Sequence, residues 1–174
     1  MNSSTSTDHN IDTLEGKLDF LRKLPFFSNK PLETVKLLAY LAKKESYRSQ
    51  EPILVQDEPA DGLFLITSGS VAICKHYQER QFLLQKLTAE ELNYFGELTL
   101  LAEFDWFFSA HAITDVTLLS ISREAFNKVM EKFPEYYKET VAKIVLLRIT
   151  RFDSQTNYLL EHLKEEAWLE CIAK

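Results

Sequence analysis

The feature that most limits how this chain can fold is a double change in the spacing of its apolar residues. Before residue 43 they recur every three or four positions, as at Leu14, Leu18 and Leu21, which predicts helices. From about residue 47 to residue 121 they gather in short runs between turn residues, which is typical of β-strands. Beyond Arg123 the helical spacing returns. The pattern predicts a β structure with helices on either side.

Two helices are expected before the β region, and two or three after it. A helix-start signal at residues 28–31 opens the second helix, whose apolar stripe runs up to Lys44. Residues 123–132 predict a short helix, and Pro134 is well placed as the first residue of the next one. A final amphipathic helix is expected over residues 158–172.

The middle of the chain contains about eight short strands by the same reasoning. The apolar runs are residues 53–55, 63–66, 71–73 and 82–84, followed by a longer strand group over residues 107–121. Three of the four glycines, Gly62, Gly69 and Gly96, fall in this region, and each marks a backbone position that a side chain would spoil. The strand spacing suits a closed or sandwiched antiparallel β structure.

The length favours one domain with a helical appendage. With 174 residues, 45% of them hydrophobic, the chain can bury one good core, and two full domains would be cramped. Residues 1–10 carry nothing to bury and are expected to be disordered. Residues 11–133 then form the leading helices and the β-barrel, and residues 134–174 form the C-terminal helices.

Charge and cysteine content argue against several classes of partner. The formal net charge of -6 gives no basic surface for nucleic acid or for an anionic membrane. No stretch holds eighteen uninterrupted apolar residues, so no membrane-spanning helix is expected. Cys74 and Cys171 lie far apart and are expected to be free thiols, which favours a reducing compartment. We therefore expect a cytoplasmic protein that binds neither nucleic acid nor membrane.

The sequence contains no coherent catalytic or metal-binding set. Ser109, His111 and Asp115 lie close together, but on an expected strand they are ordinary alternating positions rather than a nucleophilic triad. Cys74 and His76 are one pair and not a set of ligands. We expect a protein that is not an enzyme and has neither catalytic nor metal-binding residues.

One segment carries a specific resemblance to a known family. The segments that flank it, residues 24–27 and 61–71 before it and residues 112–121 and 125–126 after it, fit the same family in register. The segment is Phe95-Gly96-Glu97-Leu98-Thr99-Leu100-Leu101, here called the cassette, and it resembles the phosphate cassette of the cyclic nucleotide-binding domain family, found in protein kinase A regulatory subunits and the catabolite activator protein. The resemblance covers about residues 20–150. It implies a mainly β fold, an antiparallel jelly-roll β-barrel flanked by helices that move when cyclic AMP or cyclic GMP binds.

The resemblance also implies half of a nucleotide site in the cassette. In the family the glutamate of this motif holds the ribose 2′-hydroxyl, which gives that role to Glu97. The amides near Gly96 to Thr99 would open a short helix that faces the cyclic phosphate. A carboxylate in this position can equally cap the short helix, so both interpretations of Glu97 stay open.

The other half of the family's site is replaced. The family has an arginine nine residues after the glutamate, which pairs with the phosphate, and Trp106 stands there in this chain. Asp105 replaces the proline before it, and Phe107 and Phe108 replace two small residues after it. Losing one member of a buried charge pair costs about 2–5 kcal/mol. The pocket candidates are Phe95, Gly96, Glu97, Leu98, Thr99, Trp106, Phe107 and Phe108.

Further departures leave other questions open. The three rings at residues 106–108 can fill the core, or they can form a surface for a partner or for an apolar ligand. Asp57 lies at a turn where the family often has glycine. The nearest downstream arginine, Arg123, sits at a helix start and does not obviously replace the missing cation. The later pair Arg148 and Arg151 is expected to form structural ion pairs with acids such as those at positions 153 and 161.

Taken together, these features predict a non-catalytic regulatory or signalling module that lacks ordinary cyclic AMP or cyclic GMP binding. It would act through a protein partner, through self-association of its C-terminal helices, or through a non-standard ligand. The alternative is a genuine cyclic nucleotide sensor with an atypical phosphate contact. No cofactor is expected unless a cyclic nucleotide binds. A transcription regulator would need a helix-turn-helix after the barrel, and only about twenty residues follow Phe152.

Overall fold

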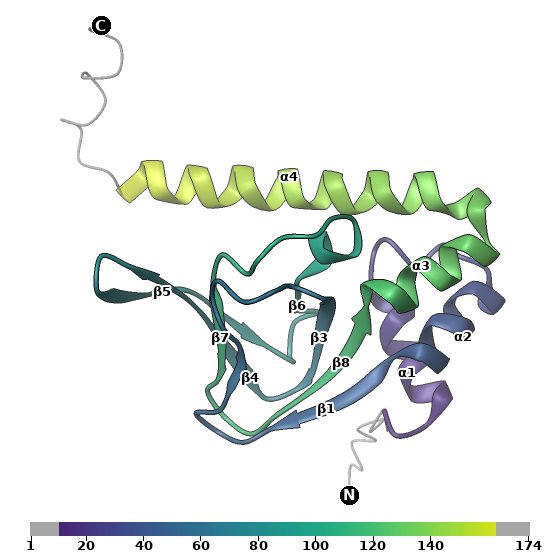
Figure 1. Cartoon of the computed structure of the whole chain (residues 1–174), viewed down its shortest axis with the longest axis horizontal. Coiled ribbons are helices and arrows are strands. Elements are labelled where there is room, and N and C mark those ends of the chain that lie inside the picture. The colour runs from purple at the N-terminus through teal and green to yellow at the C-terminus, as the bar shows by residue number, and fades with distance from the viewer. Residues whose placement is uncertain (1–10, 163–174) are drawn as a thin grey trace, which may run out of the picture.

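Eight strands form two four-stranded antiparallel sheets in the computed structural model, which describes residues 11–162 (Figure 1). One sheet has the order β1 (Lys43–Tyr47), β8 (Val116–Ser122), β3 (Gly62–Ser68) and β6 (Tyr94–Phe95). The other has the order β2 (Pro52–Leu54), β7 (Ser109–Ala112), β4 (Ser70–Tyr77) and β5 (Arg80–Thr88). Buried apolar side chains from both sheets share one core. The predicted antiparallel jelly roll with flanking helices is confirmed.

The central strands β3 and β8 are apolar on both faces because each face meets a different core. Successive side chains of a strand point to opposite sides, so neighbours in the sequence enter different cores. Phe64 and Leu118 point between the two sheets. Leu63 and Leu119 point the other way, into a core shared with the helices. This two-sided burial explains the unbroken apolar runs in the sequence.

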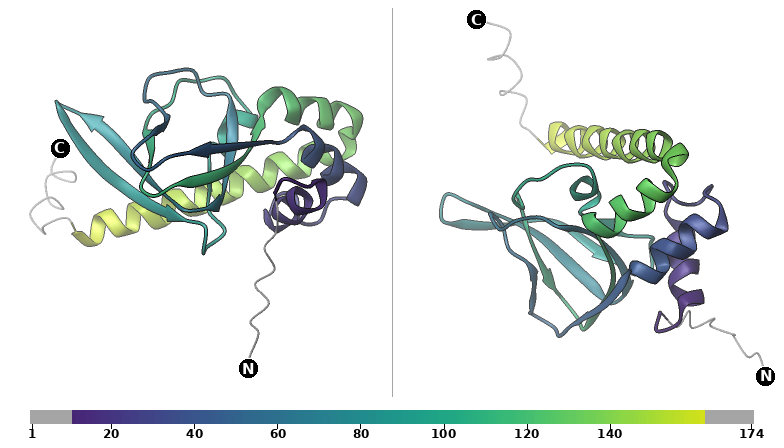
Figure 2. Two further views of the ribbon diagram at one scale, coloured as in Figure 1. Left: turned by 90° about the horizontal axis from the view of Figure 1, so that it is seen from below. Right: turned by 45° about the vertical axis from the view of Figure 1, so that its right-hand side comes forward.

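Three short helices gather at one end of the β structure (Figures 1 and 2). They are α1 (Leu14–Lys23), α2 (Leu32–Leu41) and α3 (Arg123–Lys132). Two begin with a side-chain cap: the Thr13 hydroxyl accepts a hydrogen bond from the amide of Gly16, and the Ser122 hydroxyl accepts one from the amide of Ala125. All three lie where the apolar spacing predicts helices.

The end of α2 was predicted wrongly. The apolar stripe suggested a helix up to Lys44, but α2 ends at Leu41, and Lys43 already belongs to β1. The side chains of β1 are mostly polar and exposed, so the strand carries no apolar alternation. Its position is fixed by backbone pairing with β8, for example between Lys43 and Ser120. A polar edge strand of this kind cannot be predicted from the spacing of apolar residues.

The C-terminal helical region also differs from the prediction. Pro134 opens a short 3-10 turn, η2 (Pro134–Tyr136), and one continuous helix follows, α4 (Tyr137–His162). The separate helix expected from residue 158 is therefore part of α4 as far as residue 162. The rest of that expectation, and the disorder expected for residues 1–10, lie outside the described residues. In Figure 1, α4 runs along one side of the β structure, past the cassette.

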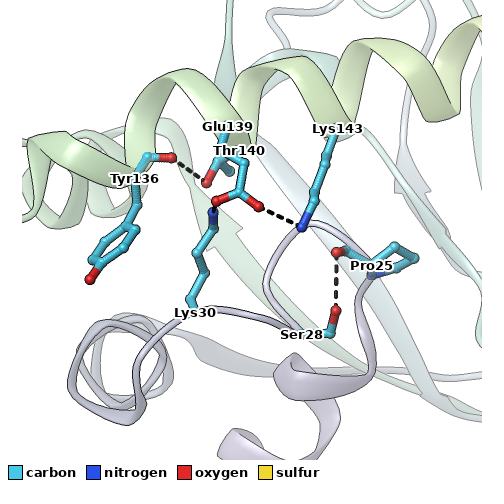
Figure 3. Close-up of polar contacts among 7 residues, drawn as sticks. All are labelled: Pro25, Ser28, Lys30, Tyr136, Glu139, Thr140 and Lys143. Carbon is cyan, nitrogen blue, oxygen red and sulfur yellow. Dashed lines mark hydrogen bonds and ion pairs between the residues drawn. The ribbon is translucent and has the colours of Figure 1, made fainter.

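A buried lysine fastens the first turns of α4 to the helical end of the molecule (Figure 3). Lys30 lies between α1 and α2, and its side chain is fully buried. Its ammonium group donates to the Glu139 carboxylate on α4 and lies 5.4 Å from the centre of the Tyr136 ring. Lys143, one turn further along, pairs with the other oxygen of Glu139 at 2.7 Å. The two lysines lower the pKa of Glu139 to about 2, Lys143 having the larger effect.

This cluster predicts a defined response to acid. Because the folded pKa of Glu139 lies below its usual value of 4.5, the stability that the charge contributes is complete above that value. It is lost as the pH falls through the folded pKa. We expect Glu139→Gln to lose less stability than the unaltered protein between about pH 5 and about pH 2, as measured by urea unfolding. Glu135→Gln, at an exposed position outside the cluster, is the control, and equal acid losses in all three proteins would contradict the cluster's role.

Candidate functional site

A cavity of about 290 Å³ lies between the jelly roll and α4. Its walls come from the cassette, from the aromatic run at residues 104–108, from β4 and β5, and from one face of α4. Seven of the eight pocket candidates line it: Phe95, Gly96, Glu97, Leu98, Trp106, Phe107 and Phe108. Thr99 is fully buried and does not line the cavity. The fold thus brings the two halves of the expected site together, although they are separated in sequence.

The turn that starts the cassette requires glycine at position 96. Gly96 has a φ of +83°, in the left-handed region that side chains disfavour. A Cβ atom here would lie 2.4 Å from the carbonyl oxygen of Gly62 and 2.9 Å from the Cη2 atom of Trp106. The backbone of β3 and the tip of the indole ring therefore both press on this turn. A side chain at position 96 would therefore have no space.

The remainder of the cassette is a 3-10 turn, η1 (Glu97–Leu100), which is braced from two directions. The Thr99 hydroxyl donates to the carbonyl oxygen of Gly96 at 2.7 Å. The Arg123 guanidinium donates to the carbonyl oxygens of Thr99 and Ala60, both at 2.6 Å, and pairs with Glu103 at 2.9 Å. Thr99 and Arg123 thus stabilise the conformation of the cassette. Neither faces the cavity.

Trp106 occupies the core of the jelly roll. Only 3% of the residue is exposed, and its ring centroid lies 5.4 Å from that of Phe108, 6.2 Å from that of Phe104 and 6.3 Å from that of Phe64. Phe108 is buried as well, whereas Phe107 is 44% exposed at the cavity. Of the two roles left open for these rings, core filling applies to Trp106 and Phe108. Both also line the cavity.

The acids near Trp106 lie away from the cavity. Asp57 has a φ of +68°, so it adopts the left-handed conformation that explains a glycine at this turn, and its amide donates to the Trp106 carbonyl oxygen at 2.7 Å. Aspartate tolerates this conformation better than most residues do. Asp105 is exposed and is not part of the cavity wall. Neither carboxylate adds negative charge to the pocket.

Two arginines from α4 complete the cavity, and the sequence interpretation misplaced both. Arg148 and Arg151 were expected to pair with the acids at positions 153 and 161, but both line the cavity. Arg151 lies 4.0 Å from the centre of the Tyr94 ring, and its Nη1 atom lies 3.8 Å from Oε2 of Glu97. It also donates to the Tyr94 carbonyl oxygen at 3.4 Å. The side chain of Glu97 is 6% exposed, so this cation is the counterion of a buried carboxylate.

Arg148 leaves the cavity with a surplus of positive charge. Its guanidinium lies 5.9 Å from the centre of the Phe107 ring, and within residues 11–162 it pairs with no carboxylate. The charged residues of the wall are Arg148, Arg151 and Glu97, so two positive charges face one negative charge and the balance is +1. Burial raises the pKa of the Tyr94 hydroxyl, and the nearby Arg151 opposes that rise. The pocket is therefore suited to a single negative charge.

The residues considered for catalysis and metal binding have structural surroundings. The Ser109 hydroxyl accepts a hydrogen bond from the Gln56 amide at 3.0 Å, and the Asp115 carboxylate accepts one from the Ser49 amide at 2.9 Å. Across the part of the chain that is described, no three His, Cys, Asp or Glu side chains gather closely enough to hold a metal ion. None of the helices described there is long and apolar enough to cross a membrane. Cys74 is a buried free thiol, as expected, and Cys171, the other expected free thiol, lies outside the described residues.

The sequence of this chain matches the model of one protein family. Residues 44–133 match the family model described as "Cyclic nucleotide-binding domain". The cyclic AMP receptor protein of Thermus thermophilus is 28% identical over 136 residues, which are 78% of this chain and 62% of that protein. This chain thus spans less than two thirds of that relative's length.

Solved structures with low sequence identity share the fold. A cyclic nucleotide-binding domain from Methylobacillus flagellatus superposes with a TM-score of 0.74 at 19% identity, covering 88% of this chain and 86% of that one. The regulatory subunit of a cAMP-independent protein kinase A from Trypanosoma brucei superposes with a TM-score of 0.65 at 20% identity. The match covers 88% of this chain and 53% of that one. Both likenesses support the jelly-roll architecture described above.

The crowding at Gly96 predicts a large effect of a very small substitution. Gly96→Ala should lower the free energy of unfolding by about 1–3 kcal/mol through backbone strain, and the contacts with Gly62 and Trp106 add to that loss. The measurement is urea unfolding followed by circular dichroism. Asp57→Gly is the matched control, because it places glycine at another left-handed position and should leave stability within about 1 kcal/mol or raise it. A Gly96→Ala variant as stable as the unaltered chain would refute this account of the turn.

Proposed function

The chain belongs to the cyclic nucleotide-binding domain family, and from this premise we propose that it is a non-catalytic regulatory module whose pocket does not bind cyclic AMP or cyclic GMP in the family's ordinary way. In this proposal α4 is held over the pocket by contacts within the protein, without a nucleotide. A protein partner then recognises α4 in this docked position. The observation that carries the proposal is the burial of Trp106 against Gly96, where the family's phosphate and its arginine are expected to meet.

The replacement of the arginine removes the charge that a cyclic phosphate needs. The indole of Trp106 can donate one neutral hydrogen bond, whereas an arginine offers a full charge and a forked set of donors. Breaking such a buried pair costs about 2–5 kcal/mol, which corresponds to a loss of about thirty- to several-thousandfold in affinity. The indole also occupies space next to Gly96, since its ring tip lies 2.9 Å from where a Cβ atom would stand on that residue.

The carboxylate expected to hold the ribose already has a partner within the protein. Glu97 already has Arg151 as its counterion, and Arg151 lies against Tyr94 as well. A ribose hydroxyl that bonded to Glu97 would have to share the carboxylate with this cation or displace it. The same contact holds the middle of α4 against the cassette. A helix held in this way needs no ligand to reach its docked position.

A surface on α4 supports the regulatory role. Leu146, Ile149 and Phe152 are 63%, 57% and 64% exposed and do not line the cavity. Exposed apolar side chains on one helix are suited to a protein partner or to a second copy of the chain. The similar Trypanosoma brucei subunit belongs to a cAMP-independent protein kinase A, so regulation without cyclic AMP has a precedent in this fold.

The second candidate function is a cyclic nucleotide sensor with an atypical phosphate contact. It is favoured by one observation, the position of Arg148 at the cavity without a carboxylate partner within the described residues. In that case the phosphate would approach α4 rather than Gly96. Binding of a nucleotide would therefore depend on Arg148.

The two candidates are separated by calorimetry. We expect no saturable heat when the full chain is titrated with cyclic AMP or cyclic GMP up to about 1 mM, because the phosphate lacks its buried cation. Circular dichroism and thermal unfolding of the same sample establish that it is folded. Micromolar binding of either nucleotide, abolished by Arg148→Gln, would overturn the proposal and establish the second candidate.

The docked position of α4 is tested by hydrogen exchange. Arg151→Gln removes the contact with Glu97, so amides in the second half of α4 should exchange about two- to tenfold faster without any nucleotide present. Arg48→Gln, an exposed arginine distant in sequence from α4, is the control and should leave those rates unchanged. Unaltered exchange in Arg151→Gln would show that this contact does not hold the helix.

A further inference from the structure

The cavity beneath α4 has an aromatic wall on one side. The wall consists of Phe104, Trp106, Phe107 and Phe108, whose ring centroids are separated by 4.9–6.4 Å from one neighbour to the next. Ile73 and Leu87 extend the apolar lining. Phe107 is the most exposed of the three rings at residues 106–108, and Trp106 and Phe108 are buried where they border the cavity. An aromatic lining favours a flat apolar ligand, which gains free energy by both burial and ring contacts. The apolar body of a ligand is therefore best placed against this wall.

The charge available to a ligand lies on α4, next to the Phe107 end of this wall. Arg151 is engaged with Glu97, whereas Arg148 has no carboxylate partner within residues 11–162 and faces the cavity beside Phe107. A guanidinium binds a carboxylate through two parallel hydrogen bonds, which fixes both distance and orientation. The surplus of one positive charge matches a ligand with one negative charge.

We propose that this cavity binds a flat aromatic monocarboxylate, with its carboxylate at Arg148 and its ring system against the aromatic wall. The inference rests on the proposed function, because it requires that the pocket is not a cyclic nucleotide site. The cavity volume of about 290 Å³ lies at the lower limit of ligand pockets, which range from roughly 300 to 1,000 Å³, and so favours a small ligand. The anion lies at α4 and not at Gly96, where the Trp106 ring tip stands.

The occupant's charge is tested with a pair of isosteric probes. We expect 2-naphthoate to bind the full chain with a dissociation constant below about 1 mM by calorimetry. The neutral analogue 2-naphthamide should bind about ten- to a hundredfold more weakly, because it lacks the charge-assisted hydrogen bonds. Equal affinity for the two probes, or no saturable binding of 2-naphthoate at about 5 mM, would overturn the inference.

The position of the charge is tested by substitution. Arg148→Gln should weaken 2-naphthoate binding by about ten- to a hundredfold and leave 2-naphthamide binding unchanged, which also shows that the variant keeps its pocket. Arg48→Gln should bind both probes as the unaltered chain does. An Arg148→Gln variant that retains full affinity for 2-naphthoate would overturn the inference. Cyclic AMP and cyclic GMP are titrated in parallel: their binding refutes the proposed function, whereas failure of 2-naphthoate alone refutes only this further inference.

Discussion

The arrangement of the pocket depends on a carboxylate that is buried away from water. Glu97 is held in the cassette by the turn at Gly96, and a carboxylate in such surroundings needs a counterion. That counterion, Arg151, comes from α4 and not from the jelly roll. One electrostatic requirement therefore joins the cassette to the C-terminal helix. Arg148 lines the same cavity from the same helix.

The replacement of an arginine by Trp106 moves the cation of the pocket without disturbing the fold. An aromatic ring can be buried among Phe64, Phe104 and Phe108, where a guanidinium would lack partners. The jelly roll therefore keeps its core, and the wall nearest Gly96 loses its charge. Positive charge remains in the cavity, but it stands on α4. A ligand is then oriented by the helix rather than by the cassette.

The features that the sequence predicted are those set by local chemistry. The apolar strand β3 and the turn at Gly96 depend on their own residues and their immediate neighbours. The apolar run and the glycine were therefore enough to predict them from the sequence. The strand β1 was missed because its pairing with β8 uses backbone groups and not apolar side chains. The roles of Arg148 and Arg151 were missed because helical spacing identifies neighbours on one helix, whereas their partners lie on the jelly roll.

The two faces of α4 link the cavity to the outer surface. Its start is fastened by Lys30 and Glu139, its inner face carries Arg151 toward Glu97, and its outer face exposes apolar side chains. A group that binds the cavity can shift the position of α4 only by as much as its affinity differs between the docked and the released helix. A partner that binds the outer face obeys the same limit, and the effect of each on the other must be reciprocal. Because α4 meets the cavity through Arg148 at Phe107 and through Arg151 at Glu97, coupling between a ligand and a partner would pass through these two contacts.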